Sequence, residues 1–371
     1  MRKFTHIVLS LLSLLSVSMA DELTEAAPSY AQNFEITEFP NYRIISIRNT
    51  HQNAKELIRY ALIPKGNAVP ELPKGTTIIR TPVERVVVME TVYIGYLEAL
   101  NKLKTIVGAG TVEFISNAAV QTRVDTGEIR SVQIGQGINI EQMLLLQPDL
   151  ILTSISGDPT FDIPAKLSRS GLPVVLTAGY MEAHPLARAE WIKFIAAFFD
   201  AETEAEQLFN DIAQRYESLR NRIPSEQEKP TVFCGAPYSG AWHVAGGESY
   251  MGRAIRDAGG DYLWSDTPQQ GAIPLDTERV FLKAARAEIW LNPSYYRSTA
   301  ELLAADPRFA KFAAARRGFV FNNTKQVGAN GGNAIWEQGI VHPDQVLADL
   351  IKIMHPELME DWDFVFYEQL R

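Results

Sequence analysis

The chain has 371 residues, 46% of them hydrophobic and 21% charged, a balance that suits a globular protein with a large core and excludes a disordered or fibrous one. Its formal charge of −9 argues against a nucleic-acid partner, because phosphate binding requires a basic patch and the lysines and arginines here are scattered. The length fits two domains of ordinary size.

Residues 1–20 have the pattern of a cleaved secretory signal. Arg2 and Lys3 precede an apolar run, and Ser18–Ala20 supplies the small residues that a signal peptidase recognises. No later stretch is apolar over the roughly eighteen residues that a membrane-spanning helix needs. We therefore expect a periplasmic protein. We expect no lipoprotein anchor, because the only cysteine, Cys234, lies far from the signal in an apolar run and is predicted to be a buried thiol.

Residues 21–80 are predicted to form a β-rich extension that packs on the first lobe. Tyr42–Arg48 and Leu57–Pro64 alternate β-forming and polar residues and are joined by a polar stretch, a pattern typical of a strand pair. Thr76–Arg80 offers one more short strand.

Alternation of strands and helices begins at Thr81 and defines a first lobe, residues 81–180. Val86–Met89 is a continuous apolar run of the kind buried in parallel sheets, and we expect Thr91 to cap the helix that follows. Asn139 is expected to cap a later helix, which leads to the apolar strand Leu150–Thr153.

The most regular pattern is a long amphipathic helix predicted over Thr203–Ile223. Thr203 is expected to cap it and Pro224 to end it, and at this length it would span roughly 30 Å. We interpret residues 181–228 as a helical strut between two lobes, the alternative being a surface helix of one large domain. The apolar stripe consists of Ala205, Leu208, Ile212, Tyr216, Leu219 and Ile223.

The alternation resumes in a second lobe, residues 229–341, and residues 342–371 form a C-terminal helix and tail. Asp276 is expected to cap a helix that leads to the strand Ile289–Leu291. The sequence thus predicts an α/β fold of two Rossmann-like βα lobes joined by one long backbone helix, with a ligand cleft between the lobes.

The two predicted lobes repeat one local pattern. In each, a capping residue is followed two positions later by a glutamate, Glu141 after Asn139 and Glu278 after Asp276, and then by a short helix and a buried strand. A carboxylate in the first helical turn is favourable in itself, so helix-dipole stabilisation alone would explain both glutamates.

With these features the chain resembles the helical-backbone substrate-binding proteins of ABC importers for ferric siderophores, haem and vitamin B12. The resemblance covers about Thr81 to Leu358. It implies a protein that captures a metal chelate and delivers it to an ABC permease, and Glu141 and Glu278 match the family's glutamates that face permease arginines. The matching stretches are Arg85–Val88, Gly137–Glu141 with Gln147–Leu152, the predicted long helix, Leu275–Val280 and His342–Asp344.

The ligand is expected at the loops that follow the strands, where open α/β sheets leave a crevice. Aromatic rings there suit a large, flat or hydrophobic chelate, and His243 and Arg297 could neutralise an anionic one. The resemblance does not choose between ferric siderophore, haem and corrinoid. The candidate contacts are Glu90, Tyr93, Gln133 and Gln136 on lobe one and Tyr238, Trp242, His243, Tyr295, Tyr296, Arg297 and Trp336 on lobe two.

We expect no cofactor and no resident metal, because the histidines lack the short spacings that place two imidazoles on one ion. We also expect a monomer and no catalytic residues. Two other functions remain open. One is a chelate-scavenging protein without a transporter, and the other is a chelate-processing enzyme of similar fold.

Overall fold

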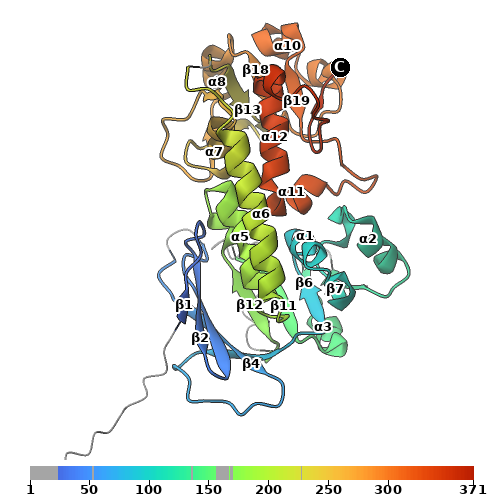
Figure 1. The fold of residues 1–371 in the computed structure, drawn as a ribbon. Helices are drawn as coiled ribbons and strands as arrows, with labels where there is room; N and C mark the ends of the chain where they lie inside the picture. The colour runs from blue at the N-terminus through green and yellow to red at the C-terminus, as the bar shows by residue number, and fades with distance from the viewer. Residues whose placement is uncertain (1–23, 52–53, 135–136, 156–166, 168–169, 227) are drawn as a thin grey trace, which may run out of the picture.

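The computed structural model describes residues 24–51, 54–134, 137–155, 167, 170–226 and 228–371. The predicted signal and Gln136 lie outside this range. Figure 1 shows two α/β lobes at opposite ends of a long helix, with an N-terminal sheet beside the first lobe. Within the described ranges, no helix combines the length and the apolar character needed to cross a membrane.

The lobe-one sheet has five strands in the order β12-β11-β6-β7-β8, and every neighbouring pair is parallel. All three valines of β6 are buried, as both faces of a parallel sheet require. Strand order reverses between β6 and β11, which makes this point the topological switch. The strands are β6 (Val86–Val88), β7 (Ile106–Ala109), β8 (Arg130–Ser131), β11 (Leu150–Ser154) and β12 (Val174–Thr177), and the helices are α1 (Val92–Ala99), α2 (Ala118–Asp125) and α3 (Ile140–Leu146).

The lobe-two sheet has the order β16-β13-β18-β19-β20, parallel except for the last strand. Its switch point lies between β13 and β18, and the antiparallel sheet β14-β15-β17 packs beside it. Cys234, the last residue of β13, is buried as predicted, and its sulfur lies 3.4 Å from the Tyr262 hydroxyl oxygen. The strands are β13 (Thr231–Cys234), β14 (Pro237–Tyr238), β15 (Ala241–Ala245), β16 (Asp261–Tyr262), β17 (Ala272–Leu275), β18 (Ile289–Leu291), β19 (Val320–Asn322) and β20 (Glu368–Gln369), and the helices are α7 (Tyr250–Asp257), α8 (Thr277–Ala284), α9 (Thr299–Ala305) and α10 (Ala313–Arg317).

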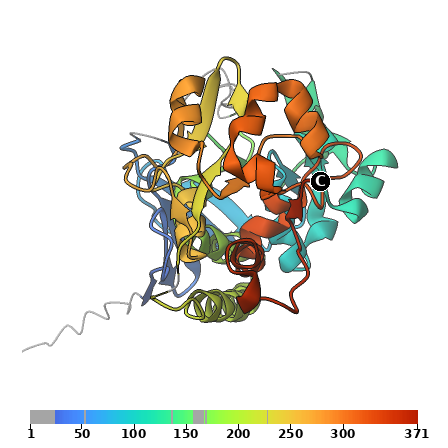
Figure 2. The same ribbon diagram turned by 90° about the horizontal axis from the view of Figure 1, so that it is seen from above.

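Three helices form the backbone between the lobes: α5 (Pro185–Ala196), α6 (Glu202–Arg220) and α12 (Pro343–Met354). Helix α6 packs along both others, and Figure 2 shows α6 and α12 side by side at one edge of the molecule. Nearly all of α5 is buried, so it is the innermost of the three.

Two predicted helix caps are wrong. Thr203 does not cap α6, because a tight turn at Asp200 (φ 51°) starts the helix one residue earlier, at Glu202. Thr91 stands at the start of α1 but makes no capping hydrogen bond. Its backbone is already helical (φ −70°, ψ −21°), whereas a capping residue is usually extended.

The N-terminal sheet has the order β1-β2-β3-β4-β5. The predicted strand pair is confirmed as β3 and β4, while β2 was not predicted. The sheet packs on the backbone helices, with Phe34 edge-on to Trp191 at 4.9 Å between ring centroids, and the Leu176 amide donates to the Tyr60 hydroxyl at 2.8 Å. The strands are β1 (Thr24–Ala26), β2 (Phe34–Phe39), β3 (Tyr42–Ile47), β4 (Ile58–Pro64) and β5 (Thr77–Thr81).

Buried carboxylates attach this sheet to the backbone. Glu190 of α5 is 0% exposed and accepts hydrogen bonds from the amides of Ser29, Tyr30 and Ala31 at 2.7–2.9 Å. The Lys193 ammonium group forms an ion pair with Glu190, with 3.1 Å between Nζ and Oε1. A fully buried carboxylate that is hydrogen-bonded and paired in this way is costly to disturb.

We expect Glu190→Gln to lower the free energy of unfolding by about 3 to 5 kcal/mol, because the new amide would turn a donor toward backbone donors. Urea unfolding measures the change. Glu206→Gln is the matched control, since Glu206 contacts the same Lys193 from a side chain that is 54% exposed and should matter by less than about 1 kcal/mol. Equal effects of the two substitutions would contradict the conclusion that Glu190 attaches the N-terminal sheet to the backbone.

Candidate functional site

A cavity of about 270 Å³ opens at the switch point of lobe one. Glu90 follows β6, while Ser154 and Thr177 end β11 and β12, so the carboxyl ends of these strands form its floor. Helices α1 and α5 supply further walls. The lobe-two side is closed by Trp336, from the 3₁₀ turn Ala334–Trp336, and by Ile340 of α11 (Gln338–Val341).

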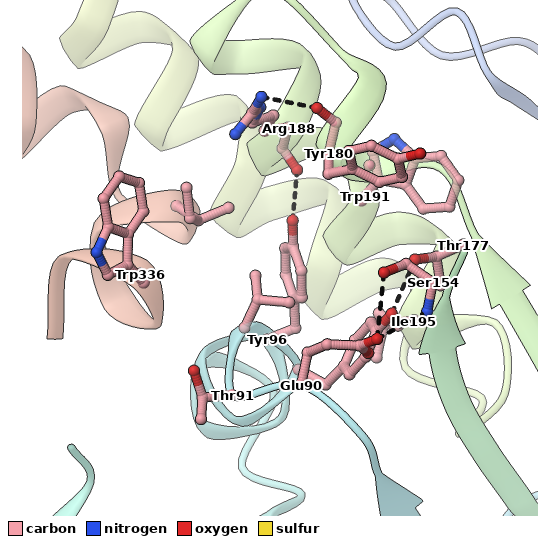
Figure 3. Close-up of a pocket in the computed structure, with 14 residues that line it drawn as sticks. Glu90, Thr91, Tyr96, Ser154, Thr177, Tyr180, Arg188, Trp191, Ile195 and Trp336 are labelled. Carbon is pink, nitrogen blue, oxygen red and sulfur yellow. Dashed lines mark hydrogen bonds between the residues drawn. The ribbon is translucent and has the colours of Figure 1, made fainter. Parts of the chain in front are cut away.

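Aromatic side chains surround the cavity. Figure 3 shows Trp336 on one side, Tyr180 and Trp191 on the other, and Tyr96 between them. The Tyr96 hydroxyl donates to the Arg188 carbonyl at 2.6 Å, and the Trp191 indole N–H donates to Glu182 at 3.3 Å. These bonds satisfy the polar ends of the rings and leave their apolar surfaces to line the cavity.

Arg188 brings a positive charge to this apolar site. Its Nε donates to the Glu182 carbonyl at 2.9 Å and Nη2 donates to the Tyr180 carbonyl at 2.7 Å, while its guanidinium lies 4.6 Å from the centre of the Tyr250 ring. Within the described part of the chain, no carboxylate lies within ion-pair distance of it. Burial lowers the pKa of Arg188. A cation held in this way favours an anionic group in the cavity.

Glu90 brings a carboxyl group to the opposite end. One oxygen accepts from the Ser154 amide at 3.1 Å and from the Thr153 and Ser154 hydroxyls at 3.2 Å each. The other oxygen is buried and has no hydrogen-bond partner among the described residues. Burial is the main cause that raises the pKa of Glu90 to about 7. Near neutral pH this oxygen can thus either accept or donate a hydrogen bond to a ligand.

A segment of lobe two, residues 330–338, lies directly on lobe one, and we call it the clasp. Asn330 donates to the Ile115 carbonyl at 2.9 Å, and Glu337, which is 1% exposed, accepts from the Ser116 amide at 2.8 Å. Gly95 of α1 leaves no room for a β-carbon against the Glu337 carbonyl. These contacts fix Trp336 over the cavity. Burial also raises the pKa of Glu337.

Only some of the predicted contacts come together. Glu90, Tyr93 and Trp336 line the cavity, with the Tyr93 hydroxyl 2.9 Å from that of Thr177. Gln133 lies on β9 (Gln133–Ile134), away from the cavity lining. On lobe two, Tyr238, His243, Tyr295 and Arg297 are exposed and Tyr296 is half-buried, and none of them lines this cavity.

The prediction for Trp242 is wrong. Its side chain is 0% exposed, donates to the Cys234 carbonyl at 3.1 Å, and belongs to the lobe-two aromatic core. We expected a loop, but Trp242 lies on β15, where successive side chains point to opposite faces, so Trp242 and Val244 point inward and His243 points outward. The sequence Ala241–Ala245 places the apolar side chains of Trp242 and Val244 on either side of polar His243, and this alternation could have indicated a strand.

Several lining residues were not predicted. Tyr96, Arg188 and Trp191 lie on helices, and Tyr180 lies in the 3₁₀ turn Gly179–Met181. The predicted contacts lie in loops that follow strands, whereas the backbone helix α5 itself forms one wall of the cavity.

Glu141 and Glu278, the two glutamates predicted to dock on a permease, are both exposed, and the caps of their helices are as predicted. The Asn139 side chain accepts from the Gln142 amide at 2.9 Å, and that of Asp276 accepts from the Glu278 amide at 2.9 Å. Glu278 forms an ion pair with Arg308 at 2.6 Å yet remains 70% exposed. Glu141 has no ion pair within the described ranges.

Comparison with known proteins places this geometry in context. A family model described as periplasmic binding protein matches residues 86–327. An uncharacterised lipoprotein of Methanocaldococcus jannaschii is 26% identical over 315 residues, covering 81% of this chain and 73% of that protein. A periplasmic haem-binding protein from Pseudomonas aeruginosa has a TM-score of 0.57 at 19% identity, over 78% of this chain and 98% of that one. Helicobacter pylori CeuE, solved with Ni(II) bound, has a TM-score of 0.58 at 16% identity, over 77% and 88%.

The raised pKa of Glu90 predicts how the stability of the protein depends on pH. Its folded pKa of about 7 lies above the ordinary value of 4.5, so the folded state binds the proton more tightly, and stability should fall as pH rises from about 4.5 to 7. Glu90→Gln removes this loss while retaining an acceptor for Ser154. We expect it to match the wild type at pH 4.5 and to be more stable by on the order of 1 to 3 kcal/mol at pH 8.

Urea unfolding at the two pH values measures this difference, with the exposed Glu113→Gln as control. A gain that is the same at both pH values would contradict the elevated pKa.

Proposed function

The chain belongs to the periplasmic binding protein family, and from this premise we propose that it is the extracytoplasmic solute-binding component of an ABC importer. In this role it captures a metal chelate in the cavity between the lobes and delivers it to a permease. The observation that carries the proposal is the cavity itself, an aromatic site at the lobe-one switch point with an arginine that forms no ion pair with any residue the structure describes. Proteins of this family work outside the cytoplasm, in agreement with the predicted signal.

The chemistry of the cavity favours an anionic chelate. Arg188 supplies positive charge, and the rings of Tyr96, Trp191 and Trp336 supply flat apolar surfaces. A second hollow of about 560 Å³, lined in part by Pro268–Ala272, shares Tyr180 with the cavity and offers room for the rest of a large ligand. We therefore place ferric siderophores and haem ahead of a corrinoid. Among the structural neighbours, one is a haem-binding protein and another was solved with Ni(II).

We propose binding rather than catalysis, because the matched family consists of binding proteins and because ligand contact accounts for both Glu90 and Arg188. Turnover of the bound chelate would overturn this assignment. Protein purified from its source before dialysis, analysed by mass spectrometry and visible absorption, identifies the chelate directly.

Arg188→Met should weaken binding of haemin or of an anionic ferric siderophore by roughly ten- to a hundredfold, the loss typical of one charged hydrogen-bonded contact. Quenching of tryptophan fluorescence measures the affinity, because Trp191 and Trp336 both line the cavity. Cyanocobalamin serves as the comparison ligand, since it lacks a strongly anionic periphery. Unchanged affinity for every anionic chelate that the wild type binds would remove Arg188 from the site.

The importer assignment is tested at Glu141 and Glu278. Reversal of both to Arg should abolish uptake, and at low salt also binding to the permease, while ligand affinity stays unchanged and stability falls only slightly, because both side chains are exposed and lie in the first turns of their helices. Single reversals should be intermediate, and complex formation should weaken with salt. Glu113→Arg, an exposed glutamate elsewhere on lobe one, is the control. Normal uptake by the double variant would favour a scavenging protein without a transporter.

A further inference from the structure

Each helix that carries a docking glutamate also carries an exposed leucine. Leu145 of α3 is 79% exposed and Leu282 of α8 is 85% exposed. Each leucine follows its glutamate by four residues, Glu141 in lobe one and Glu278 in lobe two. Residues at this spacing are neighbours on one helix face. Each lobe therefore presents a carboxylate and an apolar side chain next to each other.

The two helices have the same register. Counted from the caps Asn139 and Asp276, the fourth residue is Met143 in one helix and Val280 in the other, and both are 0% exposed. Because two residues turn a helix by roughly 200°, a buried fourth residue directs the second and sixth residues to the opposite side. The core contact thus fixes the outward direction of glutamate and leucine in both lobes.

Isolated apolar residues on a surface are ordinary and need no explanation. These two differ because they recur at one register, beside one residue type, in lobes whose strand orders differ. Leu144, 49% exposed, enlarges the apolar surface beside Leu145. A repeated pair of this kind suits a partner that presents the same chemistry twice.

Resting on the proposed function, we propose that Glu141 with Leu145 and Glu278 with Leu282 form one composite docking surface for a two-fold symmetric ABC permease. Each half of the permease would offer a cationic side chain for the carboxylate and an apolar pocket for the leucine. The carboxylates supply an attraction that salt screens, whereas burial of the leucines supplies one that salt does not weaken. The surface therefore predicts that part of the affinity persists at high ionic strength.

The test is co-sedimentation of the purified full chain with right-side-out membrane vesicles from the source cells, at low and high salt. Leu145→Ser and Leu282→Ser should each weaken binding roughly five- to tenfold, and the double variant roughly 25- to 100-fold, at both ionic strengths. Reversal of the glutamates should act mainly at low salt. Val69→Ser, at a residue 47% exposed in the N-terminal extension, is the matched control and should bind normally.

The possible results separate this inference from the proposed function. Normal binding of the double leucine variant, together with loss of binding on glutamate reversal, would overturn the leucine contacts and leave the importer assignment standing. Normal binding by both kinds of variant would overturn docking at these helices altogether. Sedimentation velocity tests the alternative that a second copy of this chain binds the surface. Dimers of the wild type that the leucine variants do not form would overturn the permease as the partner.

A photo-crosslinking residue introduced at 145 or at 282 identifies the partner. Adducts from both positions with the same polytopic permease subunit support the composite surface. Adducts with two unrelated proteins, or with a soluble protein, contradict it.

Discussion

Two buried carboxylates at the start of the helical backbone connect the main parts of this molecule. Glu182 and Glu190 together accept five consecutive backbone amides of residues 29–33. Glu182 also accepts from Trp191, and its own carbonyl accepts from Arg188. The groups that attach the N-terminal sheet therefore also orient two walls of the cavity. Buried charge is tolerated only with this degree of hydrogen bonding, so the sheet is part of the support of the site rather than a separate decoration.

The lobes are connected in more than one place. The chain passes between them through α6, α12 packs along α6, and the clasp returns from lobe two to lie against α1. Near its C-terminal end the clasp carries a buried carboxylate, Glu337, which accepts a hydrogen bond from the Ser116 amide just before α2. Trp336 is its neighbour in sequence, so the aromatic wall from lobe two is fixed by contacts with lobe one. Walls that are held in position before a ligand arrives lower the ordering cost of binding.

Local patterns predicted the fold well and the site only in part. The apolar stripe from Ala205 to Leu219 repeats at helical spacing and predicted α6, and the caps Asn139 and Asp276 act through contacts two or three residues away. Arg188 and Trp191 face the cavity because α5 packs between a sheet from the N-terminus and helices from the C-terminal half, an arrangement that no short window of sequence contains. Trp242 and Trp336 both follow glycine-containing turns, yet strand alternation buries one and the clasp exposes the other.

The two switch points differ in a way that bears on how this protein can diversify. In lobe two the carbonyls at the end of β13 are occupied, since Trp242 donates to Cys234 and Trp290 donates to Gly235, and both indoles belong to the aromatic core. Substitution there would remove several kcal/mol of packing, roughly 3 to 5 for a buried tryptophan. In lobe one the strand ends open into the cavity. If the cavity binds the ligand as we propose, mutations that change the ligand can accumulate at the lobe-one strand ends and on the cavity face of α5, while the lobe-two end remains constrained by stability.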